Sequence, residues 1–351
     1  MGLSWTDWPH DVLETFRRGT VIPAHLLALD AKRRLDARRQ RALSRYYIDA
    51  GVGGLAVGVH STQFGIRELD LYEPVLRIAA ETAAERRPLV MIAGIVGRTE
   101  QARREAEIAL GLGYHAGLLS LAAMKRASED ELIAHCRAVA QIMPLVGFYL
   151  QPAVGGIPLS RNFWRRFAEI EQVIGIKIAP FNRYRTLDVV QGVVDARAEK
   201  RIALYTGNDD TIVLDLITPY VLRRGEESVQ IRIVGGLLGH WSVWTNGAVE
   251  LFDRIKRAVE SGAIDDDLLA TAAKVTDCNA AFFDVAHEFH GCIAGCHEVL
   301  RRQGLFEGTW CLDPNEGLSA GQAEAIDRVM RLYPELGDDA FVAAHRERWL
   351  S

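Results

Sequence analysis

The chain has 351 residues, of which 49% are hydrophobic and 25% are charged, a balance typical of a soluble globular protein with a large core. Lys and Arg number 41 against 46 Asp and Glu, and the net charge of −5 argues against nucleic acid or an anionic membrane as a partner. The N-terminus lacks the pattern of a signal peptide, and no apolar run reaches the ~18 residues of a membrane span. The five cysteines are an odd number in a large chain. We therefore expect a cytoplasmic protein with reduced thiols.

Residues 1–19 predict an N-terminal helical segment, whose Trp5 and Trp8 are expected to pack over one end of the fold. Short apolar runs then alternate with Arg- and Glu-rich segments that have helical spacing. The runs occupy residues 20–29, 53–59, 88–96, 115–121, 144–150, 173–179, 201–207 and 231–237. Since they lack a polar alternate face, they predict parallel strands covered by helices. Eight such units over residues 20–261 predict an α/β fold, a (β/α)8 TIM barrel.

A doubly wound sheet is the alternative fold. Its Gly-rich turn follows a strand, however, whereas "GVGG" at 51–54 precedes an apolar run. Residues 262–351 have a helical pattern throughout. The sequence therefore predicts a TIM barrel with a C-terminal helical region packed on it.

Lys177 lies inside the apolar run 173–179, where a charged ammonium is costly without a partner. Only six of the 41 basic residues are Lys, so a lysine in a buried strand is expected to serve for its amine, which Arg cannot replace. Desolvation lowers the pKa of a lysine, and the neutral amine attacks a ketone carbonyl to form a Schiff base. The alternative is a lysine that pairs with a carboxylate or extends to the rim of the barrel.

Two neighbouring segments carry hydroxyl groups that suit the same chemistry. Tyr149 ends the apolar run before that of Lys177, and adjacent strands would bring its hydroxyl close enough to pass protons to a carbinolamine. The alternative is a core tyrosine with a hydrogen-bonded hydroxyl. The loop "VHSTQFG" (59–65) follows the second run, and the hydroxyls of Ser61 and Thr62, with the loop N–H groups, suit a substrate carboxylate.

These segments resemble the class I aldolases of the dihydrodipicolinate synthase / N-acetylneuraminate lyase family over roughly residues 20–260. The I-I-G-I-K strand of the family is similar to "VIGIK" at 173–177, and its Y-N-x-P segment is similar to residues 149–152. Its G-T-T-G-E loop falls on residues 59–63, and its Gly-Asp/Asn-Asp motif resembles residues 207–209.

The resemblance implies a lyase or aldolase that forms a Schiff base through Lys177 with pyruvate or a related 2-oxo acid, with no cofactor and no metal. It implies proton transfer by Tyr149 and Ser61. The residues expected to bind the substrate are His60, Thr62, Gln63, Val154, Gly207, Asn208 and Gly235. The expected reaction is aldol addition, cleavage or dehydration, with an aldehyde as the possible second substrate, in a homodimer or homotetramer.

Three departures separate the chain from the synthases of this family. The paired threonines of the family are His60 and Ser61, so one relay hydroxyl remains. The tyrosine pair after the fourth strand is Ala123-Met124, and the arginine that binds the carboxylate of the second substrate is Val154. We therefore expect a reaction other than dihydrodipicolinate synthesis, with a second substrate that is less acidic than an aspartate semialdehyde and is apolar or hydroxylated.

Two other hypotheses remain open. A barrel that binds a ligand or regulates a partner without turnover is the first, since Ala123-Met124 removes part of the relay. A metal-dependent enzyme is the second, because the segment 286–298 is rich in His and Cys. Its His287 and His290 are three residues apart, whereas the metalloprotease pattern needs four, and no close-spaced cysteine pair of the zinc-ribbon type occurs.

Overall fold

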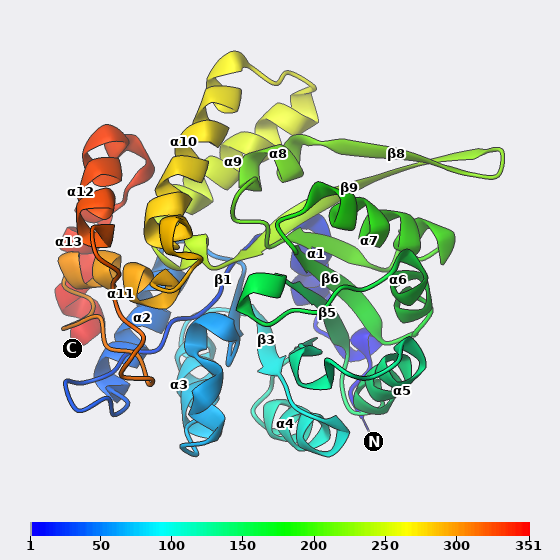
Figure 1. The fold of residues 1–351 in the computed structure, drawn as a ribbon, viewed down its shortest axis with the longest axis horizontal. Helices are drawn as coiled ribbons and strands as arrows, with labels where there is room; N and C mark the ends of the chain where they lie inside the picture. The colour runs from blue at the N-terminus through cyan, green and yellow to red at the C-terminus, as the bar shows by residue number, and fades with distance from the viewer. Residues whose placement is uncertain (1) are drawn as a thin grey trace.

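The computed structural model describes residues 2–351 and contains eight parallel strands that form a nearly closed barrel (Figure 1). These strands are β1 (Val21–Pro23), β2 (Gly54–Val57), β3 (Val90–Ile95), β4 (Ala116–Leu119), β5 (Leu145–Leu150), β6 (Val173–Ala179), β7 (Ala203–Thr206) and β9 (Glu227–Leu238). From β2 to β7 each strand pairs with the next strand in the chain, and β7 pairs with β9. β9 pairs in turn with β1. A single bridge between Ala24, directly after β1, and Ala56 of β2 nearly closes the barrel. Seven of the predicted apolar runs contain one of these strands, the eighth run (231–237) lies within β9, and the predicted (β/α)8 barrel is confirmed.

One helix precedes the first strand, others follow the strands and form the outer layer of the barrel, and further helices follow the last strand. They are α1 (His10–Arg18), α2 (Ala37–Asp49), α3 (Tyr72–Ala84), α4 (Thr99–Gly111), α5 (Glu129–Ala140), α6 (Arg161–Ala168), α7 (Arg183–Asp195), α8 (Ile212–Ile217), α9 (Thr245–Ser261), α10 (Asp266–Phe282), α11 (Cys292–Arg302), α12 (Gln322–Leu332) and α13 (Asp339–Leu350). Short 3-10 turns are η1 (Trp5–Asp7), η2 (His60–Thr62), η3 (Phe64–Arg67), η4 (Ala122–Met124), η5 (Pro152–Val154), η6 (His240–Ser242), η7 (Val285–His287) and η8 (Pro334–Leu336). No helix among residues 2–351 combines the length and the apolar character needed to cross a membrane.

Local sequence fixes where several helices begin. In α5 the hydroxyl of Ser128 accepts from the N–H of Glu131, and the carboxylate of Glu131 accepts from the N–H of Ser128 at 2.7 Å. This reciprocal arrangement satisfies two N–H groups that the helix itself leaves unpaired. Asp36, Ser160 and Asp265 cap α2, α6 and α10 in the simpler way, each with its side-chain oxygen.

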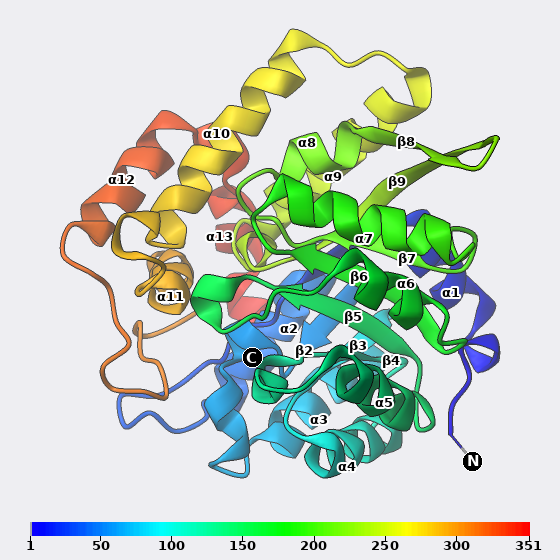
Figure 2. The same ribbon diagram turned by 45° about the vertical axis from the view of Figure 1, so that its right-hand side comes forward.

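The interior of the barrel is packed at its amino-terminal end, opposite the end where the strands finish. Trp8 and Phe16 belong to the interior cluster, and the Phe16 ring stacks on Tyr205 of β7 with centroids 4.9 Å apart. In Figure 2, α1 lies on one side of the strands and α11 on the other. Since α1 fills the amino-terminal end, the carboxyl end is the one left for a site.

A β-hairpin that the sequence analysis did not predict projects from the barrel (Figure 1). Its first strand, β8 (Pro219–Arg224), pairs antiparallel with the beginning of β9 and turns at Gly225, which has a φ of 62°. Val221 is 62% exposed there, and the hairpin adds no residue to the Lys177 cavity described below.

The helices after residue 262 continue the core of the barrel. α10 packs beside α8 and α13 beside α2, within one cluster of buried apolar residues. The hydroxyl of Tyr46 in α2 donates to Asp338, just before α13, at 2.6 Å. The C-terminal region is thus held to the barrel by both apolar and polar contacts.

Candidate functional site

A cavity of about 60 Å³ lies at the carboxyl ends of the strands. Lys177 reaches it from β6, and Asp209 reaches it from the loop after β7. His60 and Ser61 line it from η2, after β2, while Cys292 and other residues of α11 form a wall on the side of the C-terminal region. In (β/α)8-barrel enzymes in general, the reactive groups lie at the carboxyl ends of the strands.

Lys177 points into the barrel and is 6% exposed. Its Nζ lies 4.5 Å from the ring centroid of Phe148, its partner in the register between β5 and β6. The amine forms no ion pair with a carboxylate of residues 2–351, and burial lowers its pKa from 10.5 to about 8 although the charge of Asp209 acts in the opposite direction. A cation–π contact and a more distant carboxylate stabilise the ammonium less than a direct ion pair does.

Asp209 is the acidic neighbour of this amine and is 5% exposed. Its Oδ1 accepts a hydrogen bond of 2.9 Å from the backbone N–H of His240. Burial raises the pKa of the Asp209 carboxyl from 3.8 to about 7, against the opposing effects of that hydrogen bond and of Lys177. Burial, and then Lys177, lower the pKa of His60 to about 4, so its imidazole is neutral near pH 7.

Tyr149 does not reach the cavity, and this corrects the expectation that it meets Lys177 inside the barrel. Paired residues of neighbouring parallel strands face the same side, and the residue paired with Lys177 is Phe148. Tyr149 therefore faces outward, where its ring lies 5.1 Å from that of Trp164. Its hydroxyl accepts from the N–H of Leu159 at 3.2 Å and lies 3.3 Å from the carbonyl oxygen of the same residue.

Four of the predicted substrate or relay residues do line the cavity, namely His60, Ser61, Val154 and Gly207. The hydroxyl of Ser61 donates to the carbonyl oxygen of Ala24 at 2.9 Å, so its proton is directed to the backbone. At Gly207 a Cβ atom would lie 2.5 Å from Cε of Lys177. Glycine is therefore the residue that leaves room for the lysine side chain.

The other four predicted binding residues, Thr62, Gln63, Asn208 and Gly235, do not line the cavity. The hydroxyl of Thr62 accepts from the N–H groups of Gly58 and Val59, and it donates to a backbone carbonyl. The buried side-chain oxygen of Gln63 accepts from the N–H of Leu312 at 2.6 Å.

Asn208 and Gly235 likewise contact neighbouring parts of the chain. The side chain of Asn208 accepts from the N–H of Phe181 at 3.0 Å and donates to Asp215 at 2.9 Å. A Cβ at Gly235 would lie 2.7 Å from atoms of Thr20 and of the Tyr205 ring, so this glycine permits close packing within the barrel. In the structure, Thr62, Gln63, Asn208 and Gly235 thus contact the surrounding chain and lie outside the lining of the cavity.

Sequence reasoning missed several residues of the cavity. Asp209 was part of the Gly-Asn-Asp motif, and its place directly after a strand was a usable signal. Phe148 needed the register of β5, which the motif alone does not supply. Cys292 and Cys296 lie four positions apart on one face of α11, and only the tertiary structure brings them to the strand ends.

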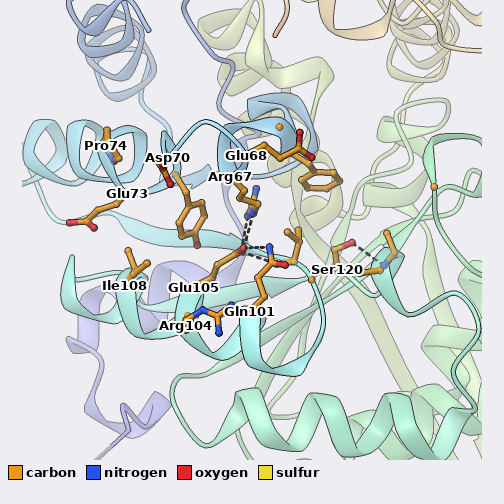
Figure 3. A pocket seen from close by; sticks show the side chains of 18 of the residues that line it. Arg67, Glu68, Asp70, Glu73, Pro74, Gln101, Arg104, Glu105, Ile108 and Ser120 are labelled. Atoms are coloured by element: carbon orange, nitrogen blue, oxygen red, sulfur yellow. Dashed lines mark hydrogen bonds and ion pairs between the residues drawn. The ribbon is translucent and has the colours of Figure 1, made fainter. Parts of the chain in front are cut away.

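A larger groove of about 1210 Å³ lies outside this cavity, beside the ends of β2 to β5. Figure 3 shows its buried ion pair, in which Arg67 Nε lies 3.0 Å from Glu105. Arg67 also donates to the carbonyl oxygens of Gly58 and Gly94, so its guanidinium joins the ends of β2 and β3. Ala123 lines this groove, and Val154 lines both the groove and the Lys177 cavity.

The His- and Cys-rich segment 286–298 contributes part of the wall of the cavity. Among residues 2–351 no three His, Cys, Asp or Glu side chains are grouped so that they could hold a metal ion. His287 Nδ1 instead lies 2.6 Å from Asp284. Cys292 and Cys296 belong to the wall of the cavity, and burial raises the pKa of both thiols.

The fold and the cavity together define the class of protein: a (β/α)8 barrel in which a buried lysine of the sixth strand faces a cavity at the carboxyl ends. Residues 17–330 match the Dihydrodipicolinate synthetase family, and the chain belongs to that family. The resemblance drawn from the sequence motifs is therefore confirmed.

Individual relatives include two kinds of protein. A 4-hydroxy-tetrahydrodipicolinate synthase of Azoarcus sp. (strain BH72) is 30% identical over 180 residues, which are 51% of this chain and 59% of that protein. An N-acetylneuraminate lyase of Citrobacter koseri is 27% identical over 200 residues, 56% of this chain and 65% of that protein. The matched stretches thus span less than two thirds of these relatives. The crystal structure of dihydrodipicolinate synthase from Oceanobacillus iheyensis has a TM-score of 0.74 at 14% identity, covers 92% of this chain and 99% of its own, and supports the fold.

Proposed function

We propose that the protein is a lyase or aldolase that forms a Schiff base between Lys177 and pyruvate or a related 2-oxo acid. The observation that carries this proposal is an amine that is buried in a cavity, has no direct ion-pair partner within residues 2–351 and has a pKa lowered to about 8 by burial. Such an amine is neutral often enough near pH 7 to act as a nucleophile. Membership of the family supports the same chemistry.

The reaction starts with attack of the Lys177 amine on the C2 carbonyl of the acid, followed by loss of water to give an iminium ion. The N–H groups of His60 and Ser61 make no hydrogen bond with a described acceptor, and they suit the carboxylate of the substrate. Loss of a proton from C3 then gives an enamine, which adds to an aldehyde. The reverse sequence cleaves an aldol.

We infer that the fragment beyond the 2-oxo acid is apolar. Aromatic and aliphatic side chains dominate the walls, among them Phe148, Phe181, Phe289 and Ile293. Val154 lies at the position of the arginine that binds a carboxylate in the synthases, so the wall offers no cation there. In a panel of aldehydes with pyruvate, we expect an aromatic or branched aliphatic aldehyde to react faster than a sugar or an aspartate semialdehyde. Faster reaction of the polar aldehydes would refute this inference.

The Schiff base is tested by reducing the protein with borohydride in the presence of pyruvate and measuring its mass. We expect a single adduct of pyruvate minus one oxygen, located by peptide mapping at Lys177, and its loss in Lys177→Arg. Lys274→Arg is the matched control, because Lys274 forms an ion pair with Glu335 at the surface. A wild type that gives no adduct, or a Lys177→Arg variant that labels as well as wild type, would refute the proposal.

A ligand-binding barrel without turnover is a second candidate, and the outward position of Tyr149 favours it, because the cavity then lacks the expected hydroxyl. This candidate predicts that pyruvate raises the melting temperature while its methyl protons do not exchange with solvent and no aldehyde reacts. The Schiff-base proposal predicts exchange of those protons through the enamine, so a single NMR experiment separates the two.

A further inference from the structure

Enamine formation needs a base beside C3 of the bound acid, and Tyr149 is not available for it. The hydroxyl of Tyr149 is held by the backbone of Leu159 on the outer face of the barrel. No tyrosine among residues 2–351 lines the Lys177 cavity, where Phe148 occupies the nearest strand position. Another group in the cavity must therefore move the proton.

The polar groups of the cavity differ in their ability to act as a base. His60 is a weak base, since its pKa is lowered to about 4 by burial and by Lys177. The hydroxyl of Ser61 is not basic near neutral pH, and burial raises the pKa of the Cys292 and Cys296 thiols, which keeps them protonated. Asp209 is the one carboxylate of residues 2–351 that lines the cavity.

The position of Asp209 suits proton transfer at the substrate. The loop that carries it follows β7, which pairs with β6, and its charge acts on Lys177. The N–H of His240 holds Oδ1 at 2.9 Å, and none of the described hydrogen bonds involves Oδ2. One oxygen is thus fixed by the backbone, and the other is available to a ligand in the cavity.

We propose that Asp209 is a catalytic residue that removes the C3 proton of the Lys177-bound 2-oxo acid and returns it, in place of the outward-facing Tyr149. This inference rests on the proposed function. In the step, the Asp209 carboxylate accepts the proton from C3, and the electron pair of the broken C–H bond forms the C2=C3 double bond. The π electrons of the C=N bond move to the nitrogen, so the iminium becomes a neutral enamine and Asp209 becomes a carboxylic acid. The reverse step delivers the proton to C3.

The electrostatics of the pair agree with this role. Burial raises the pKa of Asp209 to about 7, so the carboxylate is a stronger base than an exposed one and still ionises near neutral pH. Once Lys177 has become an iminium, its positive charge favours the ionised carboxylate that the step requires.

The experiment measures exchange of the pyruvate methyl protons in D2O by NMR, which needs no aldehyde. Wild type, Asp209→Asn, Tyr149→Phe and Asp210→Asn are compared, and each is also reduced with borohydride after equilibration with pyruvate. General-base catalysis contributes roughly 10²- to 10⁴-fold, so we expect at least about a 100-fold lower exchange rate in Asp209→Asn while the adduct still forms. Tyr149→Phe and the exposed neighbour Asp210→Asn should exchange within about threefold of wild type.

The outcomes separate the two proposals. A wild type without an adduct refutes the Schiff base itself. An adduct in all four proteins with an unchanged exchange rate in Asp209→Asn, or with loss of exchange in Tyr149→Phe, overturns the role of Asp209. If Asp209→Asn does not fold, the pH profile of wild type decides: at saturating pyruvate the exchange rate must rise as a carboxyl ionises below about pH 8, and a flat profile overturns the proposal.

Discussion

Imine formation at Lys177 should rise with pH around a midpoint near 8, because only the neutral amine attacks a carbonyl. Burial lowers the pKa of Lys177 from 10.5 to about 8. At pH 7 about one Lys177 amine in ten is then neutral, against about one in 3,000 for an ordinary lysine. The gain of about 300-fold in reactive amine corresponds to roughly 3 kcal/mol, most of it a cost of removing the ammonium from water.

The assay incubates the protein with excess pyruvate and cyanoborohydride at a series of pH values and measures the initial rate of adduct formation at each lysine by peptide mapping. Lys274 serves as the internal reference, because its hydrogen bond with Glu335 raises its pKa. We expect the Lys177 rate to level off above about pH 8 while the Lys274 rate still increases. A Lys177 midpoint at or above about pH 10, or equal rates at the two lysines, would show that burial does not activate this amine.

Two substitutions test the surroundings of the site. Glu105→Ala should lower the free energy of unfolding by about 3–5 kcal/mol in urea titrations, because it leaves the buried Arg67 guanidinium without its partner; a loss below about 1 kcal/mol would contradict this. Gly207→Ala should reduce the pyruvate adduct at least about tenfold by displacing Lys177, whereas Gly111→Ala, with nothing within 4 Å of its Cβ, should not; equal labelling of the two variants would refute the steric argument.

The strands of the barrel were predictable because none of them has an exposed position within its predicted apolar run. Such strands are short apolar runs in the sequence, and Val90–Ile95 or Val173–Ala179 has no exposed position at which a polar residue is favoured. The hairpin strand Pro219–Arg224 was not predicted, since it is short, three of its six positions are exposed, and it ends in two Arg residues. Its pairing partner is the start of β9, which extends four residues before the predicted run.

The side on which Tyr149 lies could not be predicted from its motif. The face of a strand residue depends on the phase of the alternation, and a single shift in register reverses it. The pairing of β5 with β6 shifts between Leu145 and Val146, after which Phe148 stands opposite Lys177. The Y-N-x-P motif, which ends at Pro152, identifies the strand correctly. It predicts that Tyr149 faces inward, whereas in the structure the neighbouring Phe148 does.

The lining from α11 was unpredictable for a different reason. Cys292 and Cys296 lie more than 100 residues after Lys177, and nothing in their local pattern indicates which part of the barrel they meet. Residue type is the only local signal in this segment, and a segment rich in His and Cys suggests metal binding. Its contribution to the cavity depends on how the C-terminal region is fixed to the barrel.

Asp338 is the polar residue that fixes this region, and its removal provides the last test. Its carboxylate, 5% exposed, accepts from the Tyr46 hydroxyl at 2.6 Å, the Asn246 N–H at 3.0 Å and the Gln303 side chain at 2.8 Å. Gln303 directly follows α11, so these bonds connect α2 and α9 with the helix that carries the cavity wall. Asp338→Ala leaves buried donors unsatisfied at about 1–3 kcal/mol each, and we expect a loss of at least about 3 kcal/mol in the free energy of unfolding measured in urea. Asp339→Ala is the matched control, because the carboxylate of Asp339 is exposed and, within residues 2–351, accepts only the hydrogen bond from the Gln303 side chain. Similar losses in the two variants would mean that apolar packing alone holds the C-terminal region.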